Sequence, residues 1–199
     1  MRSPLYWHPV IYQISMRLLY GRHFQDRYKA IADLIPPFSD VMELCMGDGY
    51  LYRNYLRQKK VKYLGLDINE TFVRQAGRRG ITARIHDLIT DPLPSHDYLI
   101  LQGSLYQFIP HESQIVQKAL NASRRMLVVA EPVKNLSSGR NRVVSLIAAY
   151  SANPGGRHAL YRFNEESLLQ FFRQFREFKE VIPIKGGREH MGIFVSNSW

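Results

Sequence analysis

Cysteine is nearly absent from this chain of 199 residues, which contains a single one at position 45. One cysteine excludes an internal disulfide framework and a metal site built from thiolates, and no other grouping of side chains in the sequence predicts a metal site. Long apolar runs are missing as well, because Arg2, His8 and Arg17 interrupt the apolar residues near the start. We therefore expect a cytoplasmic protein with neither a secretory signal nor a transmembrane segment.

Acidic residues are the other scarce class, with 17 against 27 lysines and arginines, so that the formal net charge is +10. Such a charge favours an anionic partner, which can be nucleic acid, an acidic lipid surface or a phosphorylated small molecule. A basic surface without a specific role is the alternative, and composition does not decide between them. The apolar content of 45% and the chain length suit one globular domain with its own core.

Short apolar runs alternate with helical patterns along most of the chain, which predicts an α/β fold. The last two runs flank Gly186 and Gly187, a hairpin signature that makes the final strand antiparallel. We expect a doubly wound, seven-stranded, mostly parallel sheet with an antiparallel last strand. The expected strands are one that starts at residue 41, followed by residues 61–67, 81–87, 97–102, 125–131, 178–184 and 191–196.

The whole chain, residues 1–199, is expected to form one domain that carries two covering segments. Residues 1–37 form a helical N-terminal cap. Its aromatic and methionine residues are expected to pack on the sheet, and covering a substrate pocket or contacting a membrane surface is the alternative; they are Tyr6, Trp7, Tyr12, Met16 and Tyr20. The cap also carries an apolar stripe. The members of this stripe are Val10, Ile11, Ile14, Leu18 and Leu19. Residues 134–163 interrupt the order of strands and helices and form a second cap, over the substrate. Asn164 then begins an amphipathic helix as its N-cap.

The most informative pattern is an apolar run that ends in two closely spaced glycines, Gly47 and Gly49. Glycine permits a positive φ or the close approach of a ligand, and a helix that follows such a turn directs its first N–H groups at that ligand. A dinucleotide fingerprint would need a third glycine where Tyr52 stands. Glu43 would also repel a pyrophosphate and attract a cationic ligand instead. An ordinary turn of an α/β domain is the alternative.

This pattern resembles the first motif of the class I, Rossmann-like, S-adenosylmethionine-dependent methyltransferases. Glu43, Gly47 and Gly49 match that motif, whereas Cys45 stands where its first glycine is usual. If position 45 needs a positive φ, a residue with a Cβ is strained there. Weak cofactor binding, or a non-catalytic cofactor-binding scaffold, is therefore an alternative to an enzyme.

Later residues extend the resemblance from residue 39 to near the end of the chain. Asp67 and Ile68 resemble the second motif, which implies that the acid holds the ribose and that the next residue packs on the adenine. Asp87 and Leu88 resemble the third motif, in which the acid accepts from the adenine amino group. Gln102 ends the fourth strand, where the family lines the methionine part of the cofactor. The resemblance thus implies S-adenosyl-L-methionine as the cofactor.

The methyl acceptor is less well defined by the sequence. Enzymes that methylate amino groups of adenine or glutamine carry a polar-Pro-Pro-aromatic run after the fourth strand, but this chain has Gln102-Gly103-Ser104-Leu105. Enzymes that methylate carbon 5 of pyrimidines need a nucleophilic cysteine, and Cys45 lies in the cofactor turn. We therefore favour O-methylation of a small-molecule or lipid-like acceptor. An RNA methyltransferase or nucleic-acid-binding protein is the alternative that the positive charge suggests.

Two sets of side chains are candidates for the acceptor site. A general base can remove the acceptor proton, and the candidates are Tyr106, His111 and His158, with Glu131 as a further one. Residues 132–164 contain no acid but several arginines, and arginine binds phosphate or carboxylate bidentately. At least one of Arg157 and Arg162 is therefore expected to contact an anionic group on the acceptor, and a solvated basic face is the alternative.

Overall fold

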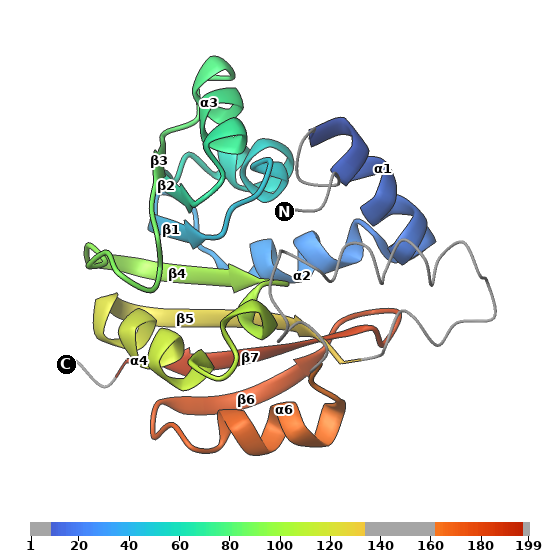
Figure 1. The fold of residues 1–199 in the computed structure, drawn as a ribbon, viewed down its shortest axis with the longest axis vertical. Coiled ribbons are helices and arrows are strands. Elements are labelled where there is room, and N and C mark those ends of the chain that lie inside the picture. Colours follow the sequence, from blue (N-terminus) through green and yellow to red (C-terminus); the bar gives the residue numbers. More distant parts are fainter. Residues whose placement is uncertain (1–8, 134–161, 197–199) are drawn as a thin grey trace.

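A seven-stranded sheet forms the centre of the computed structural model, which describes residues 9–133 and 162–196 (Figure 1). The strand order is β3-β2-β1-β4-β5-β7-β6. The strands are β1 (Asp40–Leu44), β2 (Lys62–Asp67), β3 (Ala83–Ile85), β4 (His96–Gln102), β5 (Ser123–Pro132), β6 (Phe178–Pro183) and β7 (Glu189–Val195).

Only β7 runs against its neighbours in this sheet. The pairs β1–β2, β1–β4, β2–β3 and β4–β5 are parallel, while β7 is antiparallel to both β5 and β6. Antiparallel strands can be joined by a short turn, whereas parallel ones need a crossover, and the β6–β7 turn contains Gly186 and Gly187 with φ values of +97° and +62°. The predicted sheet with its antiparallel last strand is confirmed.

Helices cover both faces of the sheet, which makes the fold doubly wound as predicted. The helices are α1 (Pro9–Tyr20), α2 (Asp26–Leu34), α3 (Glu70–Arg78), α4 (Glu112–Ala122) and α6 (Glu165–Phe172). Alternate strand residues point to opposite faces, so Val41 packs with residues of α2 while its neighbour Met42 packs with residues of α4. The first face is covered by α2 and the segment after β1, and the second by α4 and α6.

Two helices begin at asparagine side chains, as their sequences indicate. The Asn69 side chain accepts a hydrogen bond from the backbone N–H of Thr71 at the start of α3. Asn164 and Ser167 each accept from the other's backbone N–H at the start of α6, which is a capping box. The predicted N-cap at Asn164 is confirmed.

The N-terminal helix packs only in part. Tyr20 is buried and Met16 packs against the same core cluster, as expected for these two residues. Ile14 and Leu18, two members of the apolar stripe, are instead 54% and 58% exposed. The inward contact of α1 is polar at this point, because the Gln13 amide donates a hydrogen bond to the Asp48 carboxylate at 2.9 Å. By contrast, α2 belongs to the core, with Ile31 and the following Ile35 fully buried.

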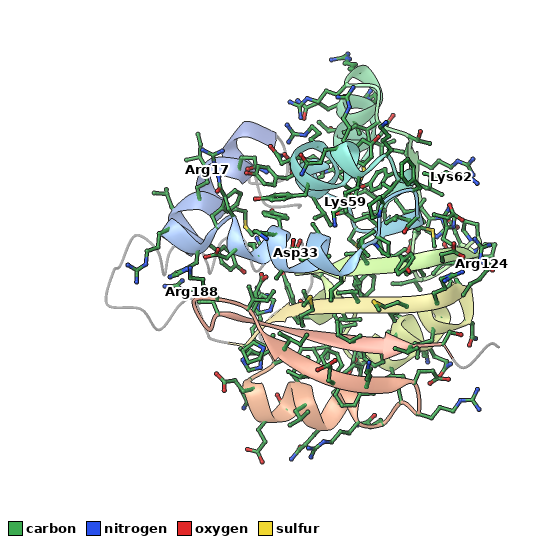
Figure 2. The ribbon with its side chains drawn as sticks, turned by 180° about the vertical axis from the view of Figure 1, so that it is seen from behind. Arg17, Asp33, Lys59, Lys62, Arg124 and Arg188 are labelled. Atoms are coloured by element: carbon green, nitrogen blue, oxygen red, sulfur yellow. The ribbon has the colours of Figure 1, made fainter. Side chains whose placement is uncertain are left out.

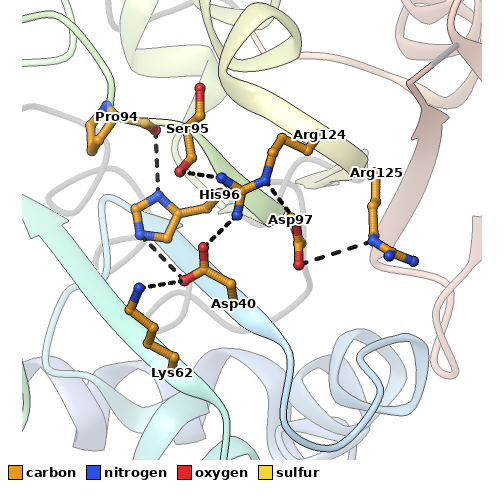
Figure 3. A network of polar contacts seen from close by, with 8 residues as sticks. All are labelled: Asp40, Lys62, Pro94, Ser95, His96, Asp97, Arg124 and Arg125. Carbon is orange, nitrogen blue, oxygen red and sulfur yellow. Dashed lines mark hydrogen bonds and ion pairs between the residues drawn. The ribbon is translucent and has the colours of Figure 1, made fainter. Parts of the chain in front are cut away.

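Ion pairs join the amino-terminal ends of three strands (Figure 3). These ends lie opposite the carboxyl ends, where ligands bind in open α/β sheets. The Arg124 guanidinium contacts Asp40 at the start of β1 at 2.7 Å and Asp97 of β4 at 2.8 Å. His96 lies 3.7 Å from the same Asp40 carboxylate. Arg124 is half exposed, so each pair contributes little to stability, about 0–1 kcal/mol.

Candidate active site

A turn of three left-handed residues follows β1. Cys45, Gly47 and Gly49 have φ values of +54°, +58° and +69°. Glycine adopts such angles without strain, whereas Cys45 carries a Cβ and is strained there. The turn is fixed to its surroundings, because the backbone N–H of Met46 donates to the Leu66 carbonyl at 3.0 Å. The sequence predicted strain at Cys45 if its φ is positive, and the structure meets this condition.

Asp67, the last residue of β2, ties this turn to the start of α3. Its Oδ2 accepts from the backbone N–H of Gly47 at 2.8 Å, and its Oδ1 accepts from that of Asn69 at 2.7 Å. The side chain is 92% buried, since Asp67 is 8% exposed. The second-strand acid thus lies directly beside the glycine turn, and the exposed Ile68 follows it.

Glu43 lies one step inside the turn and is buried. Its Oε2 accepts a hydrogen bond from the Tyr63 hydroxyl at 2.6 Å, and the Tyr63 ring stacks on Tyr52 with centroids 4.3 Å apart. Burial raises the pKa of Glu43 to about 8. At neutral pH most Glu43 side chains therefore keep their proton. The hydrogen bond from Tyr63 opposes this effect of burial, because it stabilises the ionised carboxylate.

The helical segment after the turn accommodates Tyr52 by an unusual winding. Residues Tyr52–Leu56 form a π-helical turn, and π-bulges of this kind are frequent at functional sites. Tyr52 stands where a dinucleotide fingerprint would need its third glycine. The widened helix and the stacking on Tyr63 are how the structure places this ring.

The remaining predicted cofactor residues surround the same strand ends. Leu88 is buried, and the half-buried Asp87 accepts from the backbone N–H of Ile89 at 2.9 Å. Gln102 ends β4, and its amide nitrogen lies 3.4 Å from the Glu189 carboxylate. The Cys45 thiol hydrogen-bonds with Ser104, and burial raises its pKa well above the usual value, so that it stays a thiol.

A buried ion pair beside Gln102 has no signal in the sequence. Arg27 of α2 and Glu189 of β7 are 3% and 1% exposed. The guanidinium NH2 lies 2.6 Å from Glu189 Oε1, and the Tyr20 hydroxyl donates to that same oxygen at 2.6 Å. A Cβ on Gly103 would come within 3.3 Å of the Arg27 guanidinium, so the glycine lets Arg27 approach the end of β4. The partners are 162 residues apart, and no local spacing could have predicted them.

Three of the predicted acceptor-site residues come together at the end of β5. Glu131 is fully buried, and its Oε2 accepts from the backbone N–H of Leu105 at 3.0 Å. Its Oε1 has no hydrogen-bond partner among the residues that the structure describes. Burial raises the pKa of Glu131 to about 8, against the opposing effect of Arg162. The Arg162 guanidinium lies over the Tyr106 ring, 3.4 Å from its centroid.

The other candidates lie elsewhere. His111 is exposed and directly precedes α4, and His158 and Arg157 lie outside the described residues, as does most of the expected cap at 134–163. Within residues 9–133 and 162–196, no three His, Cys, Asp or Glu side chains are grouped so as to hold a metal ion. No helix in this part of the chain is long and apolar enough to span a membrane.

Known structures share this fold at low sequence identity. A chain from the Haloferax volcanii complex containing the Trm112 methyltransferase activator matches with a TM-score of 0.72 and 12% identity, over 98% of this chain and 99% of that one. Magnesium protoporphyrin IX methyltransferase from Synechocystis PCC 6803 matches with a TM-score of 0.62 and 17% identity, over 92% and 94%. A SAM-dependent methyltransferase from Thermotoga maritima matches with a TM-score of 0.65 and 14% identity, over 94% and 96%. The chain therefore has the class I methyltransferase fold.

Sequence comparison gives a family but no individual relative. No curated protein matches the sequence. The family model described as methionine biosynthesis protein MetW matches residues 25–181, which is most of the chain and includes the glycine turn and the acids at the ends of the first three strands. The chain belongs to the MetW family.

Proposed function

We propose that this protein binds S-adenosyl-L-methionine at the carboxyl ends of β1, β2 and β4 and transfers its methyl group to a small-molecule or lipid-like acceptor, by preference to a hydroxyl oxygen. The observation that carries the proposal is the left-handed turn at Cys45, Gly47 and Gly49, held against Asp67. Ligands of open α/β sheets bind outside the carboxyl ends of the strands, and this turn lies at such an end.

The residues around the turn fit this cofactor. The exposed Ile68 next to the buried Asp67 offers an apolar surface for an adenine ring beside an acid for ribose hydroxyls. Asp87 and Leu88 follow on the neighbouring strand, and Gln102 and Cys45 line the side assigned to the methionine part. The magnesium protoporphyrin IX methyltransferase structures hold S-adenosylhomocysteine and S-adenosylmethionine, which supports the same cofactor here by analogy of fold.

The cofactor supplies an electrophilic methyl group, and the chain must position the acceptor and take its proton. Glu131 is our first candidate for this base. With a pKa of about 8, the ionised minority of Glu131 at neutral pH is a stronger proton acceptor than an ordinary glutamate, and a catalytic pKa near the working pH suits a general base. Tyr106 and Arg162 border the same carboxyl. His111 is a weaker candidate because it is exposed at the start of α4.

Arg162 supports an anionic acceptor. Its guanidinium is half-buried over Tyr106 and close enough to Glu131 to lower its pKa. A guanidinium held in this way can bind a phosphate or carboxylate of the acceptor. The roles of His158 and Arg157, and of residues 134–163 as a cap over the acceptor, stay predictions.

The proposal is tested by methyl transfer from S-adenosylmethionine labelled in its methyl group. The protein is incubated with fractionated polar metabolites, with lipids and with RNA, and the labelled product is identified by mass spectrometry. We expect a labelled small molecule or lipid, and loss of at least about tenfold in kcat for Glu131→Gln. Arg162→Gln should lower methyl transfer to an anionic acceptor. Its control is Arg173→Gln, which changes an exposed arginine at the end of α6 and should not lower it.

Two results would contradict the proposal. The first is the absence of any labelled product combined with the absence of cofactor binding. The second is a labelled product found only in RNA, with binding that weakens steeply as salt rises, because this outcome favours the nucleic-acid alternative that the charge of +10 suggests.

A further inference from the structure

A pocket lies between α1, the segment after the glycine turn and the end of α3. Its volume is about 300 Å³. This is the lower end of the range for small-molecule sites, roughly 300–1,000 Å³. Arginines from all three segments line it: Arg17 from α1, which Figure 2 labels, Arg53 from the segment after the turn, and Arg79 from the end of α3. We call this cavity the arginine pocket.

The charges in the arginine pocket do not balance. Among the described residues that line it, Asp48 is the one acid, and it is 4% exposed. Arg53 is paired with Asp48, with its NH2 2.6 Å from Oδ2. Arg17 and Arg79 are exposed lining residues, and Arg79 is near enough to Asp48 to lower its pKa against the raising effect of burial. One acid therefore faces three guanidinium groups, which leaves an excess of two positive charges.

The polar groups of the arginine pocket are also held in place. Gln13 donates to the Asp48 carboxylate at 2.9 Å, and Asn54 donates to the carbonyl of Tyr50 at 2.8 Å. The Nε of Arg53 is buried and has no hydrogen-bond partner among the residues that the structure describes. Because Asp48 fixes the Arg53 fork, little side-chain entropy remains to be lost when a ligand binds to it.

The arginine pocket adjoins the proposed cofactor site but is lined by other residues. None of the residues assigned to the cofactor is among its described lining, which meets the glycine turn at Asp48, between Gly47 and Gly49, and at Tyr50. The ligand that it takes must match two surplus positive charges and several N–H donors in a space larger than a single ion.

We propose that the arginine pocket binds a phosphate-type dianion, either as free phosphate or diphosphate or as the phosphate group of a small molecule. Guanidinium groups bind phosphate oxygens through paired hydrogen bonds. Because Asp48 is paired with Arg53, a dianion would neutralise the two positive charges that remain, those of Arg17 and Arg79. The site does not require that the cofactor is bound, so its test is independent of the proposed methyl transfer.

Calorimetry on the full chain tests this site with sodium diphosphate, inorganic phosphate and glycerol 3-phosphate, at ionic strength held constant with sodium chloride. We expect saturable binding of at least one of them. Arg79→Gln should weaken it by about tenfold, the effect of losing one hydrogen bond to a charged group, and Arg17→Gln should also weaken it. Arg78→Gln is the matched control, because Arg78 is the exposed neighbour of Arg79 and does not line the pocket. This control should bind within about twofold of wild type.

The results separate the two sources of phosphate. Tightest binding of glycerol 3-phosphate supports a phosphorylated small molecule, and equal or tighter binding of the inorganic anions supports free phosphate. The proposal is overturned if none of the three binds saturably, or if Arg78→Gln weakens binding as much as Arg79→Gln, since general surface charge then explains the affinity. Competition between diphosphate and S-adenosylmethionine would also overturn it, because the arginine pocket would then be part of the cofactor site.

Discussion

Replacing Cys45 tests the geometry of the turn after β1 most sharply. In an extended strand, a β-branched residue is favoured and glycine is disfavoured, so that stability would follow the order valine, alanine, glycine. At the observed φ of +54° the order should reverse. Glycine adopts this angle freely, alanine is strained, and valine is strained most because its branched Cβ meets the backbone.

The magnitudes follow from three contributions. Relief of the left-handed strain in Cys45→Gly contributes about 1–2 kcal/mol. The greater freedom of glycine in the unfolded chain opposes this by about 0.5–1 kcal/mol. Loss of the thiol contact with Ser104 removes about 0.5 kcal/mol more. Cys45→Gly should therefore lie within about 1 kcal/mol of wild type, and Cys45→Ala about 0.5–1 kcal/mol below Cys45→Gly.

Equilibrium unfolding in urea, monitored by circular dichroism, measures this order, and calorimetry with S-adenosylmethionine measures its effect on the cofactor site. Cys45→Gly should keep or raise the affinity for the cofactor. If Cys45→Val proves the most stable variant, residue 45 is extended and the turn is not built as described. If Cys45→Gly is as stable as wild type but clearly loses affinity, the thiol itself contributes to the cofactor site.

Two further predictions concern buried charges. Because the pKa of Glu43 is about 8 in the folded protein and near 4.5 when unfolded, the folded state holds a proton that the unfolded state releases. The free energy of unfolding should therefore fall as the pH rises from about 5 to about 8. The fall should be smaller in Glu43→Gln than in wild type, and the exposed control Glu180→Gln should behave like wild type. Urea midpoints that decline equally in all three proteins would contradict this. Arg27→Met leaves Glu189 buried without its guanidinium partner and should lower the free energy of unfolding by about 3–5 kcal/mol. Adding Glu189→Leu should recover most of the loss, and a double variant as unstable as the single one would refute the pairing as its cause.

Local patterns predicted the parts of the fold that depend on local chemistry. The alternation of apolar runs with helices gave the parallel sheet, the double glycine gave the β6–β7 hairpin, and Asn164 gave the start of α6. The acids Glu43, Asp67 and Asp87 were found because each lies at or near the carboxyl end of an apolar strand pattern. Each of these features is decided within about ten residues of chain, where a periodic pattern or a cap is visible.

The features that the sequence did not predict depend on distant partners. Ile14 and Leu18 fit a helical stripe, but distant contacts turn another face of α1 inward, where Gln13 meets Asp48 and Tyr20 enters the core. The Arg27–Glu189 pair joins α2 to β7 across the sheet, and neither residue stands out in its own segment. The arginine pocket draws on three segments separated by loops and strands. The net charge of +10 indicated an anionic partner but could not locate its site.

Calorimetric titration with S-adenosylmethionine of wild type, Asp67→Ala and Asp97→Ala tests the proposed cofactor site most directly. Asp97 provides the matched control, because it is an acid near the amino-terminal end of β4, away from the carboxyl ends of the strands (Figure 3). Wild type and Asp97→Ala should bind one equivalent alike, and Asp67→Ala should bind more weakly by about 1–3 kcal/mol, with its urea midpoint showing that it is folded. Equal affinity of all three proteins would contradict the placement of the cofactor, and binding of NAD without any response to S-adenosylmethionine would contradict the proposed function itself.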